Sequence, residues 1–227
     1  MTEHNDNFTI AIIGGTGREG KGLAYRWAKA GHSILIGSRS IDKAKYAAEE
    51  LKTLVSNSSI IGFENIDAAE RADILVLTVP YQAHREILES LREKARAKIV
   101  IDVCVPLNPK QITTVQILSA GSAAMEAQEI LTQDVKVAAA FHNISYDLLL
   151  KDDPIDCDVL VCCSDEKAKT IVLKLVKDAK LNGWDSGPLE NSIISEGLTA
   201  ILIGINKKYG SRNSGIKITG VPTVTNL

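Results

Sequence analysis

The sequence has few aromatic residues and no excess of charge of either sign. Phe, Trp and Tyr make up 4% of the 227 residues, and the formal net charge is -2. Nucleic-acid-binding domains carry basic patches that bind phosphate groups, and no long basic run is present here. The balance of charge argues against nucleic acid as a partner and favours a small molecule.

Long apolar runs are also absent, so the sequence contains no candidate membrane span. Residues 1–7 are polar and lack the basic and apolar regions of a signal peptide. The apolar content of 45% and the charged content of 24% are typical of globular domains. These features predict a cytoplasmic protein without a membrane partner.

Cysteine is scarce, and its spacing fits neither a metal site nor a disulfide framework. The four cysteines are Cys104, Cys157, Cys162 and Cys163. Adjacent residues of a strand point to opposite faces, so Cys162 and Cys163 would not share a metal ion. We expect no metal site, and we interpret the thiols as core residues that the cytoplasm keeps reduced.

Short apolar runs alternate with segments of helical periodicity along most of the chain. Strands are predicted at 8–13, 34–36, 60–61, 74–79, 98–103, 135–141 and 158–163. Helices are predicted at 21–30, 41–55, 83–95, 122–131, 165–179 and 191–207, with a short turn or helix at 67–72 and a turn at 184–188. This alternation predicts an α/β protein of the Rossmann type, with a doubly wound, mainly parallel sheet covered on both faces.

No linker or internal repeat divides the chain. We expect a single Rossmann domain over residues 8–220, in which residues from about 189 to 220 form a small helical extension. Residues 1–7 and 221–227 are predicted to be flexible tails, and the chain after Lys217 to be loosely attached.

The glycine-rich segment after the first predicted strand is the strongest indication of function. Gly15-Thr16-Gly17-Arg18-Glu19-Gly20 has the GxGxxG spacing and opens a predicted helix. In such a turn Gly15 permits the sharp bend, Gly17 lets a diphosphate approach the backbone, and Gly20 lets helix and strand pack closely. The helix N-terminus adds free N–H groups and a partial positive charge. The segment therefore predicts a nicotinamide dinucleotide site.

The end of the second predicted strand favours NADP(H) over NAD(H). NAD-selective proteins usually place an acidic residue there to bind the ribose hydroxyls, whereas this chain has Gly37-Ser38-Arg39. A hydroxyl and a guanidinium suit a 2′-phosphate, and Lys43 adds a second cation close by. The alternative is that Arg39 and Lys43 are solvated surface charges.

Three further segments lie at the carboxyl ends of predicted strands, where open α/β sheets bind ligands. Thr78-Val79-Pro80 and the loop that contains Val105 are predicted to line the nicotinamide side, although Pro80 would also end a strand without any ligand. His142 is a candidate to donate a hydrogen bond or a proton to the second substrate, or it is an ordinary structural histidine.

The sequence lacks zinc-ligand spacing and a serine nucleophile elbow. Hydride transfer needs only two rings held face to face, which a site of backbone and apolar groups can supply. This favours a reductase whose second ligand is itself a redox cofactor.

Motifs along nearly the whole chain resemble those of the NADPH-dependent reductases of coenzyme F420, the F420H2:NADP oxidoreductases. The matching segments are Ile12-Ile13-Gly14-Gly15-Thr16-Gly17, Gly20-Lys21-Gly22-Leu23-Ala24, Ile36-Gly37-Ser38-Arg39, Lys43-Ala44, Ala72-Asp73-Ile74, Thr78-Val79-Pro80, Pro106-Leu107, His142, Ile144, Gly187-Pro188-Leu189, Asn191-Ser192, Leu198-Thr199 and Gly215-Ile216-Lys217.

The resemblance implies a hydride transfer between the nicotinamide C4 and the C5 of a deazaflavin, in a compact Rossmann domain whose helical C-terminal part dimerises. It implies that the NADP adenosine phosphate is held by Thr16, Ser38, Arg39 and Lys43. His142, Ile144 and Thr199 would line the deazaflavin pocket, and Ile144 would set the spacing between the rings.

The chain departs from that family at two positions and at its end. Ile193 and Gly197 stand where an arginine and a serine are expected, and neither side chain can form a hydrogen bond. The chain also continues beyond Lys217, where the family's chains end. Two alternatives therefore remain open: a reductase of the same fold with another acceptor, such as a flavin, a metal chelate or a small carbonyl compound, and a non-catalytic NADP-sensing protein.

Overall fold

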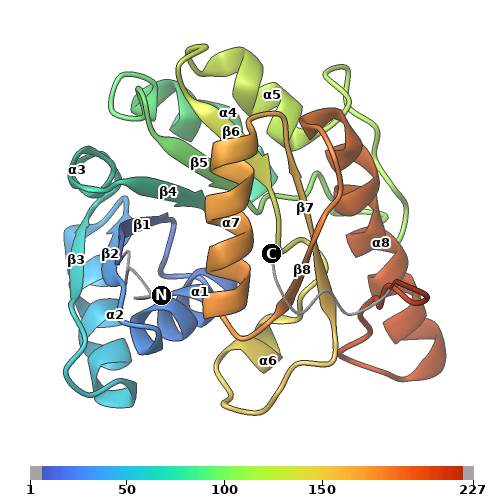
Figure 1. The fold of residues 1–227 in the computed structure, drawn as a ribbon, viewed down its shortest axis with the longest axis horizontal. Coiled ribbons are helices and arrows are strands. Elements are labelled where there is room, and N and C mark those ends of the chain that lie inside the picture. Colours follow the sequence, from blue (N-terminus) through green and yellow to red (C-terminus); the bar gives the residue numbers. More distant parts are fainter. Residues whose placement is uncertain (1–6, 222–227) are drawn as a thin grey trace.

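The computed structural model, which describes residues 7–221, contains one eight-stranded sheet with helices on both faces (Figure 1). The strand order is β3-β2-β1-β4-β5-β6-β7-β8, and all neighbours are parallel except β6 and β7. This confirms the predicted doubly wound, mainly parallel sheet. The strands are β1 (Thr9–Ile13), β2 (Ser33–Ser38), β3 (Ile60–Glu64), β4 (Ile74–Leu77), β5 (Ile99–Asp102), β6 (Lys136–Ala139), β7 (Asp158–Cys163) and β8 (Asn182–Asp185).

Three of the described helices begin after a residue whose side chain binds a free N–H group of the first turn. Ser40, Ser122 and Asp165 each accept a hydrogen bond from the backbone N–H three residues on. In the part of the chain that the structure describes, no helix is long and apolar enough to cross a bilayer. The helices are α1 (Arg18–Lys29), α2 (Ile41–Leu54), α3 (Asn65–Arg71), α4 (Tyr81–Leu91), α5 (Ala123–Ile130), α6 (Tyr146–Leu149), α7 (Glu166–Asp178) and α8 (Ser192–Tyr209), with a 3-10 turn η1 (Leu189–Asn191).

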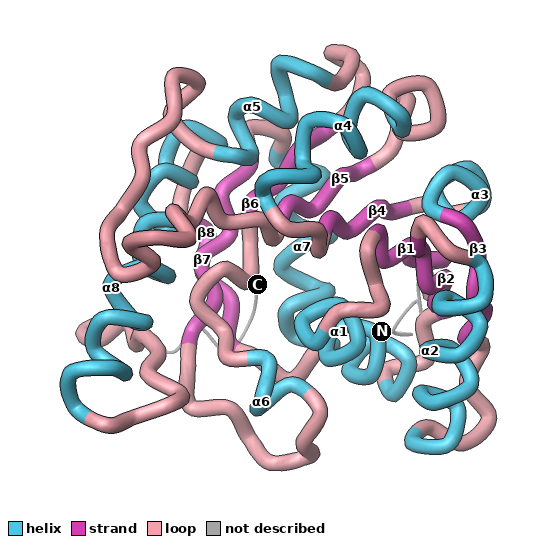
Figure 2. Tube along the Cα trace, turned by 180° about the vertical axis from the view of Figure 1, so that it is seen from behind, coloured by secondary structure: helices cyan, strands magenta, loops and turns pink. Residues whose placement is uncertain are grey.

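Two hydrophobic cores lie on the two faces of the sheet. Helices α1, α2 and α7 cover one face, and α3, α4 and α5 the other (Figure 2). Along β4, Ile74 and Val76 belong to the first core, and Leu75 and Leu77 to the second. Strands covered on both faces are apolar at every position, which explains the unbroken apolar runs in the sequence. Cys162 and Cys163 lie in opposite cores, and all four cysteines are buried and unpaired, as predicted.

A buried arginine fixes the segment that follows β6. The Arg26 guanidinium on α1 donates hydrogen bonds to the carbonyl oxygens of Leu149 and Leu148 at 2.8 and 3.1 Å, and also to that of Lys151. A buried guanidinium with several acceptors satisfies the polar groups of an irregular segment that could not otherwise lie against a helix. This segment leads away from His142, so Arg26 also fixes one wall of the site described below.

The turn predicted at 184–188 begins too early, because Asn182–Asp185 form β8 at the edge of the sheet, and the chain turns after it, where Gly187 has a φ of 87°. Four residues with no alternation of apolar and polar side chains give no periodic signal. The strand is held by its pairing with β7 and by the Trp184 indole, which donates to Asp158 Oδ2 at 2.8 Å. The short helix α6 was not predicted either.

The C-terminal part is less helical than predicted. Helix α8 ends at Tyr209, because Gly210 adopts a left-handed conformation with a φ of 66°, and the chain to residue 221 contains no further helix. This segment is attached to β7, since Asp158 N–H donates to Ile216 O at 2.9 Å and Ile218 N–H donates to Asp158 Oδ2 at 2.8 Å. The predicted tails lie outside the described residues, apart from Asn7 and Val221.

The packing of β3 against α2 depends on the absence of a side chain at Gly62. A Cβ at this position would lie 2.4 Å from backbone atoms of Ala44 and Lys45. We expect Gly62→Ala to lower the free energy of unfolding by about 1–3 kcal/mol, because one backbone would have to move. Urea unfolding followed by circular dichroism measures this loss.

The control is Gly204→Ala in α8, where the nearest atom to a Cβ is Thr113 Cβ at 3.6 Å. This change should leave stability unchanged or raise it by up to about 1 kcal/mol through helix propensity. Equal unfolding midpoints for the two variants would contradict this account of the α2–β3 contact.

Candidate functional site

A cavity of about 680 Å³ opens at the edge of the sheet where the parallel strands end. It extends from the β2 side, lined by Ser38 and Lys43, to the α8 side, lined by Asn206 and Arg212. The strand order reverses between β1 and β4, and open α/β sheets bind their ligands at such a switch point. The volume lies in the range of small-molecule and cofactor sites.

The glycine turn after β1 forms the floor of this cavity. Gly15 N–H donates to Gly37 O at 2.9 Å, and a Cβ on Gly15 would lie 2.7 Å from Ile12 O. A Cβ on Gly20 would lie 2.8 Å from Gly15 Cα, so the close helix–strand packing expected of Gly20 is confirmed. The left-handed residue of the turn is Gly14, with a φ of 75°, and not Gly15. A Cβ on Gly17 would meet only Gly14 O, at 3.7 Å, which leaves room for a phosphate beside its backbone.

The six residues of the motif have three different placements. Thr16, Gly17 and Glu19 line the cavity, whereas Gly15 and Gly20 are buried inside the turn. Arg18 does not line the cavity: its guanidinium lies over the Tyr146 ring, and its Nη1 donates to the Tyr146 hydroxyl at 3.0 Å. The structure therefore places Arg18 on the rim, against the segment after β6.

Glu19, in the first turn of α1, is the one acidic residue among the described residues that line the cavity. Its Oε1 is inaccessible to solvent and has no hydrogen-bond partner among residues 7–221. Burial raises the pKa of the Glu19 carboxyl to about 8, because the charged form loses its hydration. At neutral pH Glu19 is therefore mostly uncharged, which suits a place beside an anion.

Arg39 and Lys43, the two cations predicted to bind the 2′-phosphate, lie on the β2 side of the cavity. Arg39 and Lys43 are exposed, and neither forms an ion pair with any described carboxylate. Ser38 is buried beside them, and its Oγ accepts a hydrogen bond from Ser40 N–H at 3.3 Å. Two unpaired cations and a fixed hydroxyl at one end of a cavity suit a phosphate group.

The residues predicted at the ends of β4 and β5 also line the cavity: Thr78, Val79, Pro80 and Val105. The Thr78 hydroxyl donates to Ile13 O at 3.0 Å and so joins the ends of β4 and β1. Pro80 precedes α4, three residues beyond the end of β4. These positions form the middle of the cavity.

His142 enters the cavity because the chain turns sharply after β6. Phe141 has a φ of 68°, a conformation that non-glycine residues rarely adopt. Both ring nitrogens of His142 are buried and lack a hydrogen-bond partner within the described part of the chain. Burial lowers the pKa of His142 to about 4, so the ring is neutral at physiological pH. A neutral ring can donate one hydrogen bond, but the proton-donor role predicted as an alternative is disfavoured.

Thr199 and Ile144 line the cavity next to His142. The Thr199 hydroxyl donates to His142 O at 2.7 Å and fixes α8 against the turn after β6. Ile144 is 6% exposed and lines the cavity beside His142. The two positions at which the chain departs from the family, Ile193 and Gly197, lie outside this cavity and border a small pocket beneath Pro106 and Leu107.

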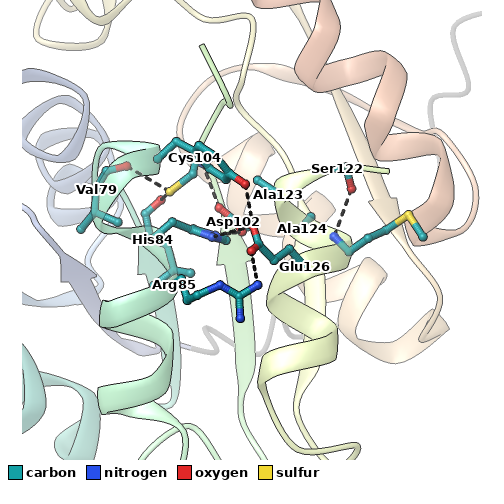
Figure 3. A network of polar contacts seen from close by, with 12 residues as sticks. Val79, His84, Arg85, Asp102, Cys104, Ser122, Ala123, Ala124 and Glu126 are labelled. Carbon is teal, nitrogen blue, oxygen red and sulfur yellow. Dashed lines mark hydrogen bonds and ion pairs between the residues drawn. The ribbon is translucent and has the colours of Figure 1, made fainter. Parts of the chain in front are cut away.

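A buried polar network supports the loops after β4 and β5 (Figure 3). Asp102, at the end of β5, accepts hydrogen bonds from Cys104 N–H at 2.9 Å and from His84 Nε2 at 2.7 Å. Cys104 Sγ in turn donates to Val79 O at 3.1 Å. Burial opposes the charge on His84, but the Asp102 carboxylate outweighs it and raises the His84 pKa. The network thus holds the backbone that presents Val79 and Val105.

The ligand atoms of His84, Asp102 and Cys104 lie within 4.8 Å of one another, the spacing of a metal site. Each of the three already forms a hydrogen bond within the network, which accounts for their proximity. The expectation of no metal stays a prediction. Asp102 could have been singled out from the sequence, because a carboxylate that ends the apolar run 98–103 must find a partner when buried.

A second buried carboxylate joins α8 to α5. Glu196 accepts hydrogen bonds from Ala123 N–H at 2.8 Å and Ala124 N–H at 3.1 Å, where its charge would suit the N-terminus of α5. Burial nevertheless raises the pKa of Glu196 to about 8.

Several lining residues were not predicted. Asn65 accepts a hydrogen bond from Gly14 N–H at 3.3 Å, and Asn206, Arg212 and Ser214 line the α8 end. They lie at element ends or in a segment without periodicity, so nothing in the pattern of the sequence marks them.

Comparison with known proteins leads to the family whose motifs the sequence resembles. A family model described as NADP oxidoreductase, coenzyme F420-dependent, matches residues 9–106. The F420-dependent NADP reductase of Methanocaldococcus jannaschii is 40% identical over 221 residues, which cover 93% of this chain and 98% of that protein. The F420-dependent NADP reductase of Methanothermobacter thermautotrophicus is 39% identical over 223 residues, with 94% and 95% covered.

A solved structure from Arthrobacter sp. FB24, named as a candidate F420-dependent NADP-reductase, shares the fold with a TM-score of 0.81. It is 23% identical and covers 94% of this chain and 100% of its own. The similarity to the two archaeal reductases is closer in sequence and extends over almost the full length of each. With that similarity, and with the glycine turn on the floor of the cavity, this chain belongs to the family of F420-dependent NADP reductases.

Proposed function

We propose that this protein is an oxidoreductase that transfers a hydride between NADP(H) and coenzyme F420. The observation that carries the proposal is one continuous cavity that joins the glycine turn and Arg39 to His142 and Thr199. Such a cavity can hold two ring systems side by side. We place the reaction in the cytoplasm, where the buried thiols would stay reduced.

The β2 side of the cavity fits NADP(H). The open space beside Gly17 and the N-terminus of α1 would take the diphosphate, with the Thr16 hydroxyl beside it. Arg39 and Lys43 would bind the 2′-phosphate together with Ser38, because no acidic side chain at the end of β2 would repel it.

The middle and the α8 side of the cavity fit the deazaflavin. When both are bound, the nicotinamide C4 and the deazaflavin C5 supply the two ends of the hydride transfer. His142 offers a single uncharged N–H to a polar ring edge, and Ile144 presents an apolar side chain at the ring face. The proton that accompanies the hydride comes from solvent, because burial disfavours a charged His142.

The function is tested by mixing NADPH with oxidised deazaflavin and following the loss of the deazaflavin absorbance band. The wild-type protein should bleach it. Arg39→Ala should weaken NADPH by about 1.5–3 kcal/mol, a 10- to 150-fold rise in KM, because a charged hydrogen bond is lost. The KM for NADH should change little.

The matched control is Lys45→Ala, which removes an exposed cation of α2 that does not line the cavity. It should leave both KM values unchanged. Equal losses for NADPH and NADH in Arg39→Ala would refute the 2′-phosphate assignment. Bleaching of a flavin instead of the deazaflavin would favour another acceptor, and tight NADPH binding without turnover would favour a sensor.

The buried Glu19 predicts that cofactor binding depends on pH. Above a pH of about 8 the Glu19 carboxyl ionises and opposes the diphosphate, so NADPH affinity should fall as pH rises from 7 to 9. Glu19→Gln should flatten this decline, because the amide cannot ionise. Fluorescence titration of NADPH at each pH measures the effect. Glu49→Gln, an exposed change on α2, serves as the control, and a Glu19→Gln profile that coincides with wild type would contradict the prediction.

We propose that the protein forms a homodimer through one face of α8. Ile194, Ile201 and Ile205 are exposed, and their spacings of seven and four residues place them on one stripe of the helix. Ile112 and Ile117, in the segment between β5 and α5, are exposed as well. An apolar helix stripe of this kind is typical of a subunit contact.

Ile201→Glu should convert the dimer to a monomer, because a charge would be buried without a partner in the contact. Sedimentation velocity measures the change in mass. Ile66→Glu on α3, where the native side chain is 45% exposed, should leave the assembly intact. A wild-type protein that sediments as a monomer would refute the proposed contact.

A further inference from the structure

The charged residues that line the cavity lie in two separate places. Among the described residues, the lining cations are Arg39 and Lys43 on the β2 side and Arg212 beyond α8, and the acid is Glu19 on α1. Arg39 and Lys43 follow β2, whereas Arg212 follows α8, in the segment that is hydrogen-bonded to β7, five places from β2 in the strand order. No hydrogen bond or ion pair within residues 7–221 joins Arg212 to Arg39 or Lys43, so the lining cations form two groups.

The turn that carries Arg212 is fixed to the wall of the cavity on two sides. After the left-handed Gly210, Ser211 N–H donates to Asn206 O at 3.0 Å, and Ser214 N–H donates to Asn206 Oδ1 at 3.0 Å. From the other side, the Ser145 hydroxyl donates to Asn213 Oδ1 at 2.7 Å. A turn held in this way can present its side chains at a defined place.

The groups that this turn presents to the cavity are hydrogen-bond donors. Because Asn206 Oδ1 accepts from the backbone, the Nδ2 group of the same amide is left to face a ligand. The Ser214 hydroxyl and the Arg212 guanidinium line the same end, and neither has a side-chain partner within residues 7–221. No carboxylate among the described lining residues lies at this end. Such a set of donors is complementary to an anion.

We propose that Asn206, Arg212 and Ser214 form a subsite for the anionic side chain of the deazaflavin substrate. This inference rests on the proposed function. Coenzyme F420 carries a phosphodiester and carboxylates on the ribityl chain of its deazaflavin, and these groups would extend from the ring beside His142 toward the α8 side. Arg212 is thus a specificity residue that distinguishes the complete cofactor from the bare deazaflavin.

Equilibrium binding tests this subsite without any need for turnover. Binding is measured from the quenching of deazaflavin fluorescence, with the complete cofactor and with the same deazaflavin lacking phosphate and carboxylates. Arg212→Ala should weaken the complete cofactor about tenfold, the effect of one exposed charged hydrogen bond, and leave the truncated form unchanged. Arg212→Lys should recover part of the loss.

Lys208→Ala is the control, because Lys208 is an exposed cation of α8 that does not line the cavity. It should change neither affinity. A third ligand, the deazaflavin with its phosphate alone, identifies the anion: a loss with this ligand assigns the phosphate, and a loss only with the complete cofactor assigns the carboxylates.

Equal losses for the complete and the truncated deazaflavin, or no loss for either, would overturn the subsite. Failure of the proposed function looks different, since the wild-type protein would then bind or reduce neither deazaflavin while Arg39 still determined NADPH affinity. The subsite would then be rejected together with the function, because it rests on binding of the deazaflavin.

Discussion

The contact between two glycine backbones, Gly15 in the turn and Gly20 in the first turn of α1, is the constraint on which the site depends. A Cβ on Gly20 would lie 2.8 Å from Gly15 Cα and 2.8 Å from the Thr78 hydroxyl oxygen, so only glycine lets α1 approach the ends of β1 and β4. That approach directs the N-terminus of α1 into the cavity. Without it, the free N–H groups of the helix would be displaced from the edge of the sheet where the other lining residues gather.

The rest of the structure holds the two ends of the cavity in a fixed relation. In the middle of the cavity, the network of Asp102 and His84 supports the loops after β4 and β5. Arg26 on α1 holds the irregular segment that follows β6. Thr199 fixes α8 to the turn that carries His142. Hydride transfer depends on the placement of two rings more than on any reactive side chain, so rigidity of this wall is what the protein contributes.

The polarity of the cavity follows from the same arrangement. Cations without an ion-pair partner among residues 7–221 lie at both ends, while burial keeps Glu19 and His142 uncharged between them. Charge at the ends binds anionic groups, and an uncharged middle suits aromatic rings. A cavity of this kind selects its ligands by the anionic groups at their ends. Its middle, where the hydride would be transferred, is left free of competing acids and bases.

The sequence could predict those features that depend on local pattern. The alternation of apolar runs and helices predicted the parallel sheet, and GxGxxG in its strand–helix context predicted the turn, with Ser38, Arg39 and Lys43 beside it. It could not predict features that depend on contacts between distant segments. The four-residue strand β8 has no periodicity, and Arg212 and Ser214 reach the cavity only because the chain after α8 folds back onto β7.

The central claim is that the glycine turn binds the diphosphate of NADP while Arg39 binds its 2′-phosphate. A crystal structure of the protein with NADP+ tests this most directly. The account predicts diphosphate oxygens within hydrogen-bond distance of the backbone N–H groups that follow Gly17, and the 2′-phosphate beside the Arg39 guanidinium. A dinucleotide bound elsewhere, or a turn filled by a side chain of the protein itself, would contradict it.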